Sequence, residues 1–527
     1  MARCAFTIAV AAYLVISAAA VVAGVRLLHT MSAASVTSAI GGPAVEASAS
    51  PPRYLVLMVI DGGRPDYLTI THLPHLQALM AQGTTFTHAF DGILEAETPA
   101  GHTTIATGSP PARNGILGFS WTQSDNDAYS LFSEAQMPNV ISLLERANDP
   151  TIAGLYKKAH PDARVVALSG HKYYAATPLG GPEADAIMYY KGDEKDRYVP
   201  VAVPGHEPPP GILSDPSLRS PTTHNPPTTE DTLATKLALA TFQKLHQRIT
   251  LINYPEFDWP LGHVFGGIEN RGKVIERMRG FDKDLGMIED AYHKAGILNQ
   301  TLFVITSDHG MMPIKRFVPD SIITDAISAA GTSQVNATYN SGAYIWVSDT
   351  TKANIVAQNI VNAGNPGIQS VYYLSSAGGV PQYVLAGGQV ADAQTRTANS
   401  FLLQTLIDGH QPNIVVIGTE GSSFSDPSVG WKGDHGGTSW QSQHIPLVFS
   451  GPGIRQGAVS KKPALLEDVA PTLLTDMGVR PVGMQGHVLT DAFQFPTFGD
   501  TRNRSREIAH LRPVMQGLLA QESGNTG

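Results

Sequence analysis

The chain has 527 residues, 42% of them apolar and 15% charged, so it can bury a large core and could hold two or three domain-sized units by length alone. Its formal net charge of −9 argues against a nucleic-acid partner bound through phosphates, which favours a basic surface. Small phosphate substrates are not excluded, because divalent cations held by carboxylates reverse the local field. The only cysteine is Cys4, so an intramolecular disulfide is excluded.

The N-terminus is typical of an exported protein. Arg3 precedes an uncharged run over residues 4–25, and a loose Ser/Ala/Gly segment follows to residue 50. The run is longer than a signal-peptide core of about 7–15 residues. It also reaches the ~18 residues that span a bilayer. We therefore expect residues 1–50 to be a signal peptide or a membrane anchor plus linker, with the protein periplasmic, extracellular or anchored to the membrane by residues 4–25.

Four apolar segments predict buried strands that run into polar residues. They lie at 53–60, 249–258, 301–310 and 444–453. Residues 274–292 carry apolar side chains at spacings of three and four, as one face of a helix requires. Alternating strands and helices predict an α/β fold, a mostly parallel sheet sandwiched by helices, with functional groups at the carboxyl ends of the strands.

Three further segments complete the expected organisation. The Pro-rich stretch 199–227 predicts an extended surface loop. Residues 330–425 alternate strand and helix patterns and predict a small inserted α/β lobe within a catalytic domain spanning 51–498. Residues 499–527 are polar, and we expect them to form a frayed tail.

Acidic and imidazole side chains follow the predicted strands or lie in a glycine-rich turn. A buried carboxylate at a strand end needs a partner, and a divalent metal can supply it. Carboxylate oxygen and neutral imidazole nitrogen are common zinc ligands, and three protein ligands leave one position open for substrate. Taken singly, each residue could instead cap a helix or lie in a loop. Together they predict two divalent metal sites, and zinc is the expected ion. The two ligand sets are Asp61, Asp308 and His309, and Asp258, His263 and His435.

Thr98 lies in the polar turn TPAGH, which leads into an apolar helical stretch. The N-terminus of such a helix offers backbone N–H groups to an anion. A threonine hydroxyl is a poor nucleophile unless a base or a metal activates it. No Ser-His-Asp arrangement is evident, so a metal is the expected activator, and a simple helix cap is the alternative for Thr98.

These motifs resemble the nucleotide pyrophosphatase/phosphodiesterase branch of the alkaline phosphatase superfamily, and also its alkaline phosphatases with a threonine nucleophile. The resemblance is carried by VIDGGRPDYL at 59–68, TPAGHTTIATG at 98–108, SDHGMMP at 307–313 and GDHGG followed by HIPLVFSGPG. It implies an alkaline-phosphatase-like fold, two zinc ions in the two ligand sets above, and Thr98 between them. The implied reaction is in-line attack by Thr98 to give a phosphothreonine, which water then hydrolyses. The implied substrate is a small phosphate ester or nucleotide; the sequence sets no oligomeric state.

One ligand pair departs from the family's spacing. The family usually separates this Asp and His by four positions, whereas Asp258 and His263 are five apart. Either a bulge absorbs the extra residue, or Glu256 contributes.

Two substrate-binding positions also depart from the family. Phe119 stands where the family has an Asn that holds a phosphoryl oxygen, and Ser120 follows it. Lys172 matches the Lys of the Lys-x-Arg pair in monoesterases, but Tyr174 replaces the arginine. A tyrosine cannot donate the two parallel hydrogen bonds that a guanidinium gives to phosphate. We therefore expect Lys172, Phe119 and Ser120 to face a phosphodiester or pyrophosphate. An alkaline phosphomonoesterase and a non-catalytic metal-binding relative are the alternatives.

Overall fold

The computed structural model describes residues 50–122, 128–221, 229–388 and 392–523. The expected signal or anchor at 4–25 lies outside these residues. Within the described part, no helix is long and apolar enough to cross a membrane.

The central sheet has ten strands, and its five middle strands are parallel. In sheet order these are β11 (Thr301–Thr306), β1 (Tyr54–Ile60), β10 (Ile249–Tyr254), β6 (Val165–Ser169) and β7 (Ala186–Gly192). One side continues with β21 (Leu447–Ser450), β2 (Gly83–Phe86) and β22 (Ala458–Ser460), and the other with β8 (Arg197–Ala202) and β9 (Ser220–Pro221). The predicted α/β fold with a mostly parallel sheet is confirmed, and β21 runs antiparallel to both β11 and β2.

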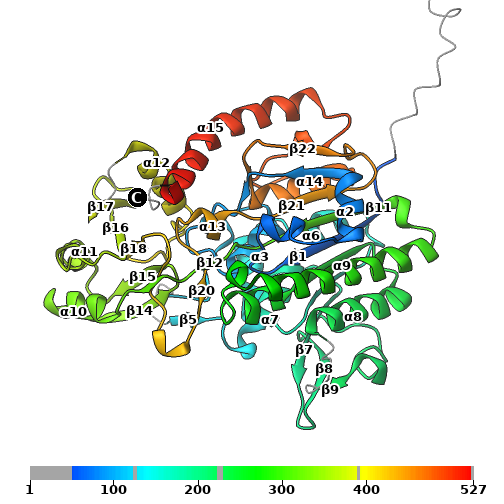
Figure 1. The fold of residues 1–527 in the computed structure, drawn as a ribbon, viewed down its shortest axis with the longest axis horizontal. Helices are drawn as coiled ribbons and strands as arrows, with labels where there is room; N and C mark the ends of the chain where they lie inside the picture. The colour runs from blue at the N-terminus through cyan, green and yellow to red at the C-terminus, as the bar shows by residue number, and fades with distance from the viewer. Residues whose placement is uncertain (1–49, 123–127, 222–228, 389–391, 524–527) are drawn as a thin grey trace, which may run out of the picture. The chain divides into compact units, whose positions relative to one another are not determined.

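Helices cover both faces of this sheet, as the sequence of β1 requires. Its residues from Leu55 to Ile60 are all fully buried and alternate between two hydrophobic cores. One core includes α2 (Pro74–Ala81), α8 (Glu230–Leu245) and α9 (Arg271–Lys294). The other includes α3 (Thr98–Thr107), α5 (Met137–Ala147), α6 (Ile152–Ala159), α7 (Tyr173–Gly180) and α14 (Val469–Asp476). Figure 1 shows α8 and α9 side by side.

The helix predicted over 274–292 is α9. Its predicted apolar face is buried in full, comprising Val274, Met278, Phe281, Leu285, Ile288 and Tyr292.

A second, five-stranded antiparallel sheet lies within the range 330–425, for which the sequence predicts an inserted lobe. Its order is β14 (Gln334–Tyr339), β15 (Gly342–Val347), β18 (Ile414–Gly418), β16 (Ile368–Ser375) and β17 (Gln382–Gly388). One face packs on α10 (Ser321–Ala329) and α11 (Ala353–Asn362). The other face joins the main core through α12 (Ala393–Gln404). Because α10 shares this core, the lobe includes residues that precede position 330.

Two loop or tail expectations are wrong in part. Residues 498–523 form a long helix, α15 (Phe498–Ser523), which packs along α12 instead of fraying (Figure 1). Its buried Leu511, Val514 and Leu518 explain the order, because burying these side chains favours a docked helix. In the Pro-rich stretch, residues 199–202 belong to β8, which pairs with β7.

Short two- to four-residue elements complete the described fold. They are the pairs β3 (Ala89–Phe90) with β23 (Ala464–Leu465), β4 (Ser120–Thr122) with β5 (Ala128–Ser130), β12 (Met312–Pro313) with β20 (Gly433–Asp434), and β13 (Arg316–Phe317) with β19 (Ser422–Ser423), and the helices α4 (Pro111–Asn114) and α13 (Trp440–Gln443).

Candidate metal centre

Charged side chains follow the carboxyl ends of four neighbouring parallel strands. Asp61 comes directly after β1, Asp308 follows β11, Asp258 follows β10, and Lys172 follows β6. Because the carboxyl ends of parallel strands meet at one edge of the sheet, these four side chains converge there. All four are at least nine-tenths buried.

The three predicted histidine ligands share one arrangement. In each ring Nδ1 lies within hydrogen-bond distance of a backbone carbonyl, so we assign the N–H to Nδ1 and leave Nε2 with a free lone pair. The pairs are His309 with Gly310 at 2.9 Å, His263 with Gly433 at 2.9 Å, and His435 with Ala96 at 2.8 Å. This tautomer is the one that a metal ligand requires.

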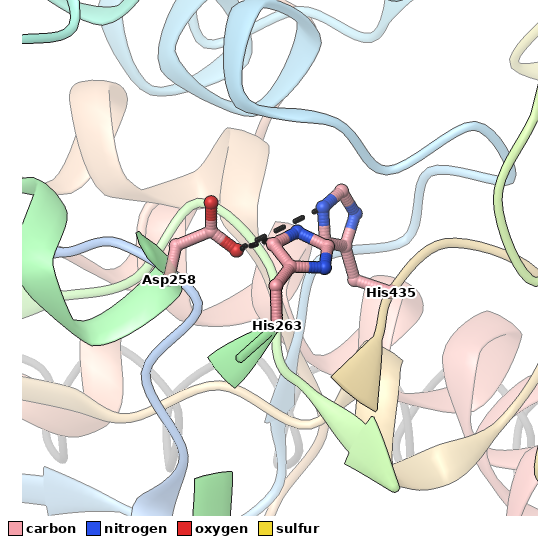
Figure 2. A group of neighbouring side chains, drawn as sticks. All are labelled: Asp258, His263 and His435. Atoms are coloured by element: carbon pink, nitrogen blue, oxygen red, sulfur yellow. Dashed lines mark ion pairs between the residues drawn. The ribbon is translucent and has the colours of Figure 1, made fainter. Parts of the chain in front are cut away.

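The predicted set of Asp258, His263 and His435 comes together (Figure 2). Asp258 Oδ1 lies 3.2 Å from His263 Nε2 and 3.9 Å from His435 Nε2. Within the described part of the chain, this oxygen has no hydrogen-bond partner. Lone pairs of a carboxylate and two imidazoles therefore face one another in a buried space, an arrangement that a shared cation stabilises.

The five-residue spacing of this pair is absorbed by an irregular turn. Within Asp258–Gly262 the backbone is kinked at Trp259 (φ −122°, ψ 117°), and the N–H of His263 donates to the carbonyl of Asp258 at 3.0 Å. Across this kinked turn Asp258 Oδ1 and His263 Nε2 come within 3.2 Å of each other. Glu256, the alternative ligand, forms an ion pair with Arg277 at 2.8 Å instead.

The second predicted set lies beside the first. His309 Nε2 is 3.4 Å from Asp308 Oδ2 and 3.8 Å from Asp61 Oδ1. The His309 side chain is fully buried, and neither its Nε2 nor Asp308 Oδ2 has a hydrogen-bond partner among the described residues. His309 and Asp61 also group with Asp258, so the two sets adjoin.

Two residues that the sequence analysis missed hold these carboxylates. Nδ1 of the buried His102 lies 2.8 Å from the carbonyl of Thr98 and 3.2 Å from Asp308 Oδ2. Nδ2 of Asn253 lies 2.9 Å from His102 Nε2 and 2.7 Å from Asp61 Oδ2. His102 also groups with Asp61 and Asp308 as a possible ligand set, but both of its ring nitrogens already have partners. It therefore fits an orienting role better than a ligand role.

Thr98 begins α3, the helix whose N-terminus points at this cluster. Its Oγ1 donates to Asp61 Oδ1 at 3.5 Å and accepts from Lys172 Nζ at 3.2 Å. The glycine in TPAGH makes this packing possible, since a Cβ on Gly101 would lie 2.5 Å from the carbonyl oxygen of Asp308.

Lys172 is the only lysine at the centre of the described cluster. Its Nζ donates to Asp258 Oδ2 at 2.6 Å and to Asp61 Oδ1 at 2.8 Å. Burial alone lowers the pKa of Lys172, but Asp258 and Asp61 more than reverse this, so its pKa lies well above the ordinary value. The ammonium is therefore charged.

One ammonium does not balance the buried carboxylates. Burial and then the charge of Asp308 raise the pKa of Asp61, and Lys172 only partly offsets them. Burial likewise raises the pKa of Asp308, but His309 and His102 bring it below its usual range.

Burial also raises the pKa of Asp258, but Lys172 and His263 bring it well below its usual value. Three buried carboxyl groups therefore share one ammonium, and two of their oxygens, Asp258 Oδ1 and Asp308 Oδ2, accept no hydrogen bond among the described residues, an arrangement that divalent cations fit.

A pocket of about 570 Å³ opens over the cluster, and all three predicted substrate-binding residues line it. Lys172 lines it, and its Nζ also contacts Thr98 Oγ1. The ring of Phe119 stacks on Phe132 at 4.4 Å and meets Tyr174 edge-on at 4.8 Å. Ser120 is held through Asn336 Nδ2, which donates to its Oγ at 3.1 Å. At position 119 the pocket wall is therefore aromatic, whereas the family that the sequence resembles usually has an Asn side chain there.

Comparison with known sequences gives a consistent assignment. Residues 55–437 match the type I phosphodiesterase / nucleotide pyrophosphatase family. A stretch of 159 residues is 30% identical to the alkaline phosphatase PhoK of a Sphingomonas species and covers 28% of each chain. Another of 121 residues is 30% identical to the alkaline phosphatase PhoD of Zymomonas mobilis and covers 21% of this chain and 20% of that one. The matched stretches thus span less than a third of either relative.

Solved structures share the fold at low sequence identity. The wild-type alkaline phosphatase PafA is 17% identical with a TM-score of 0.65, covering 85% of this chain and 100% of that one. Murine ectonucleotide pyrophosphatase / phosphodiesterase 5, solved as an inactive variant in complex with AMP, is 15% identical with a TM-score of 0.56, covering 86% of this chain and 99% of that one.

Proposed function

The chain belongs to the type I phosphodiesterase / nucleotide pyrophosphatase family. From this premise we propose that it is a phosphoester hydrolase that cleaves phosphodiesters through Thr98 with two bound zinc ions. The observation that carries the proposal is a set of buried ligand atoms that make no hydrogen bond within the described part of the chain: His309 Nε2, Asp258 Oδ1 and Asp308 Oδ2. Such atoms are costly to bury unless a cation joins them.

The donor chemistry fits zinc. One ion would be held by Asp61, Asp308 and His309, and the other by Asp258, His263 and His435, the nitrogen and carboxylate donors that zinc prefers. Bound there, zinc would supply Lewis acidity that lowers the pKa of the Thr98 hydroxyl and stabilises the oxygen that leaves phosphorus.

The chain's own residues would do the rest of the chemistry. The Thr98 hydroxyl gives its proton to solvent and its oxygen forms a bond to phosphorus, while the bond from phosphorus to the leaving oxygen breaks and that oxygen takes up a proton from solvent. The ammonium of Lys172, within 3.2 Å of that oxygen, would balance charge on the phosphoryl group, and the N-terminus of α3 would add its partial positive charge. In the second step water forms a new bond to phosphorus, the bond to Thr98 breaks, and the hydroxyl regains its proton.

A diester is favoured over a monoester by the shortage of cationic side chains. Lys172 is the only lysine, and no arginine is present, among the described residues that line the pocket. A monoester carries up to two negative charges on the reacting phosphoryl group, and a bidentate arginine commonly meets the second. Tyr174 stands where that arginine is expected, so a singly charged diester fits better.

Kinetics on matched esters test this choice. We expect zinc-loaded protein to hydrolyse methyl p-nitrophenyl phosphate with a higher kcat/KM than p-nitrophenyl phosphate. Chelation should abolish turnover and added zinc should restore it. Equal or better turnover of the monoester would overturn the diester assignment.

An alkaline phosphomonoesterase is the second candidate, because both sequence relatives named above are called alkaline phosphatases and Lys172 contacts Thr98. Under this alternative, Lys172→Ala removes most monoesterase activity, while activity on the diester falls less.

A further inference from the structure

The pocket in front of Thr98 has two aromatic walls. On one side Phe119 stacks on Phe132 and meets Tyr174. On the other, the ring of Trp431 lies 4.0 Å from the ring of His263 and 6.4 Å from that of Trp259. Both walls line the same pocket.

Large apolar side chains are exposed at the rim of this pocket. Phe132 is 65% exposed, Val429 51% and Trp259 43%. Exposed apolar groups that gather at a cleft commonly contact a ligand. These three line the same pocket as the proposed ligands Asp258, His263 and His435.

The charged groups of the wall are acidic. Beyond the metal ligands and Lys172, the described lining includes the carboxyl groups of Glu97, Asp434 and Asp426. His171, the other basic side chain of the lining, is already paired with Glu230.

Neutral donors, not basic side chains, hold the two buried acids. Glu97 accepts from the N–H of Phe119 at 2.7 Å and from Asn340 at 3.3 Å. Asp434 accepts from Ser423 at 2.6 Å and from Ser425 at 3.2 Å. Neither acid is paired with a basic side chain in these contacts, and burial raises the pKa of Glu97 to about 7, so Glu97 carries a partial negative charge near neutral pH.

Asp426 adds charge at the exposed rim. It accepts from the N–H of Ser428 at 2.8 Å, and this bond, together with one to the Ser428 hydroxyl, lowers its pKa. It is therefore a carboxylate at neutral pH.

We propose that the site selects phosphodiesters whose organic group carries no further negative charge, with a positively charged head group as the best fit, and that it rejects nucleoside polyphosphates. The proposal rests on the proposed diesterase function and narrows it to a substrate class. An ammonium group is attracted to the faces of aromatic rings and to carboxylates. A second phosphate would meet the acids and find no arginine or second lysine in the described lining.

Three diesters with the same leaving group test the charge order. Zinc-loaded protein is assayed with p-nitrophenyl phosphodiesters whose second ester group is choline, ethyl or 2-carboxyethyl. We expect kcat/KM to fall in that order, with at least a tenfold difference between the first and the last. ATP should inhibit only weakly at concentrations that match the KM of the choline ester.

Charge variants connect the order to named residues. Asp426→Asn, which keeps the turn to Ser428, should reduce the ratio of kcat/KM for the choline ester to kcat/KM for the carboxyethyl ester. Asp426→Lys should reduce this ratio further. Glu97→Gln should act in the same direction if it folds; the exposed Asp426 variants keep the test valid if it does not. Asp500→Asn, on α15, is the matched control and should leave the order unchanged.

The outcomes separate the two proposals. If none of the three diesters is hydrolysed, the diesterase function fails and the charge selection with it. Turnover with the carboxyethyl ester equal to or better than the choline ester overturns the charge selection alone. A kcat/KM ratio between the choline and carboxyethyl esters that the Asp426 variants leave at the wild-type value also overturns it.

Discussion

At the scale of single residues, the centre depends on groups that orient its ligands as well as on the ligands. His102 and Asn253 contact Asp308 and Asp61 through atoms that leave Asp61 Oδ1 facing the centre. Second contacts of this kind fix the direction of a ligand's lone pairs and commonly change metal affinity when removed.

Removing the His102 ring should therefore weaken metal binding. We expect His102→Ala to lower zinc affinity about 10- to 100-fold. Competition with a chelator of known affinity measures this, and His72→Ala, an exposed histidine, serves as control. Unchanged affinity with lowered activity would assign His102 to a different role.

Two separate zinc sites predict a simple stoichiometry. Wild-type protein should bind two zinc ions, and His263→Ala or His309→Ala should each weaken one site because three protein ligands become two. Elemental analysis after dialysis at limiting free zinc should then find about one zinc ion per chain in each variant. Loss of both ions in each single variant would instead indicate one shared site.

The clustering of the six proposed ligands could be predicted because Asp and His follow apolar strands or lie among glycines, where no core role explains them. His102 and Asn253 could not, since each stands inside an otherwise regular helix or strand. The contacts that define their role join residues 102 and 253, and only the folded chain brings these together.

At the scale of elements, close helix packing explains the ordered C-terminal helix. A Cβ on Gly517 of α15 would lie 2.2 Å from the backbone oxygen of Gln394 on α12. The polar composition of this segment predicted a frayed tail. The few apolar side chains of α15 stabilise the helix only when they pack against α12, and the local sequence does not show that contact.

Two glycine substitutions of the same kind should have opposite effects. Gly517→Ala should lower the free energy of unfolding by about 1–3 kcal/mol through overpacking. Gly280→Ala on α9, where the added Cβ meets nothing within 4 Å, should raise it by up to ~1 kcal/mol through helix propensity. Urea denaturation followed by circular dichroism measures both. A stabilising Gly517→Ala would show that the contact between α12 and α15 is loose.

The turn at Asp258–Gly262 shows what local sequence can and cannot settle. The spacing of five positions indicated an irregularity, but a bulge and a substitute ligand were equally compatible with it. The i to i+5 hydrogen bond between His263 and Asp258, and the ion pair of Glu256 with Arg277, decide between them.

At the scale of the whole molecule, the apolar strands and the amphipathic α9 were sufficient to predict the α/β class. Strand direction was not: the run containing Leu447–Ser450 reads the same either way, and the β21 connection makes it antiparallel. The lobe's elements were visible in its sequence. Its core was not confined to the predicted range, because α10 packs with residues distant in the chain.

Buried carboxyl groups away from the metal centre should make stability depend on pH. Burial raises the pKa of Asp476 to about 8, above its ordinary 3.8. Since the folded pKa is the higher one, this group's contribution is fully present below pH ~4 and is lost as the pH rises through about 8.

The Asp476→Asn variant should therefore gain stability relative to wild type as the pH rises. We expect the difference in unfolding free energy to shift in its favour by on the order of 2 kcal/mol between pH 4 and pH 9. Urea denaturation across this range measures it, with Asp162→Asn, an exposed position, as control. A difference that is flat with pH would show that Asp476 is ionised without cost.

The central claim is that Thr98 forms a covalent bond to phosphorus. Zinc-loaded protein mixed with methyl p-nitrophenyl phosphate, quenched in acid and digested, should yield a peptide with the methyl phosphate group on Thr98. Thr98→Ala should bind zinc, lose at least ~10³-fold in kcat and give no adduct, while Thr98→Ser should keep part of the activity and carry the adduct on the serine. Near wild-type turnover by Thr98→Ala would contradict the account.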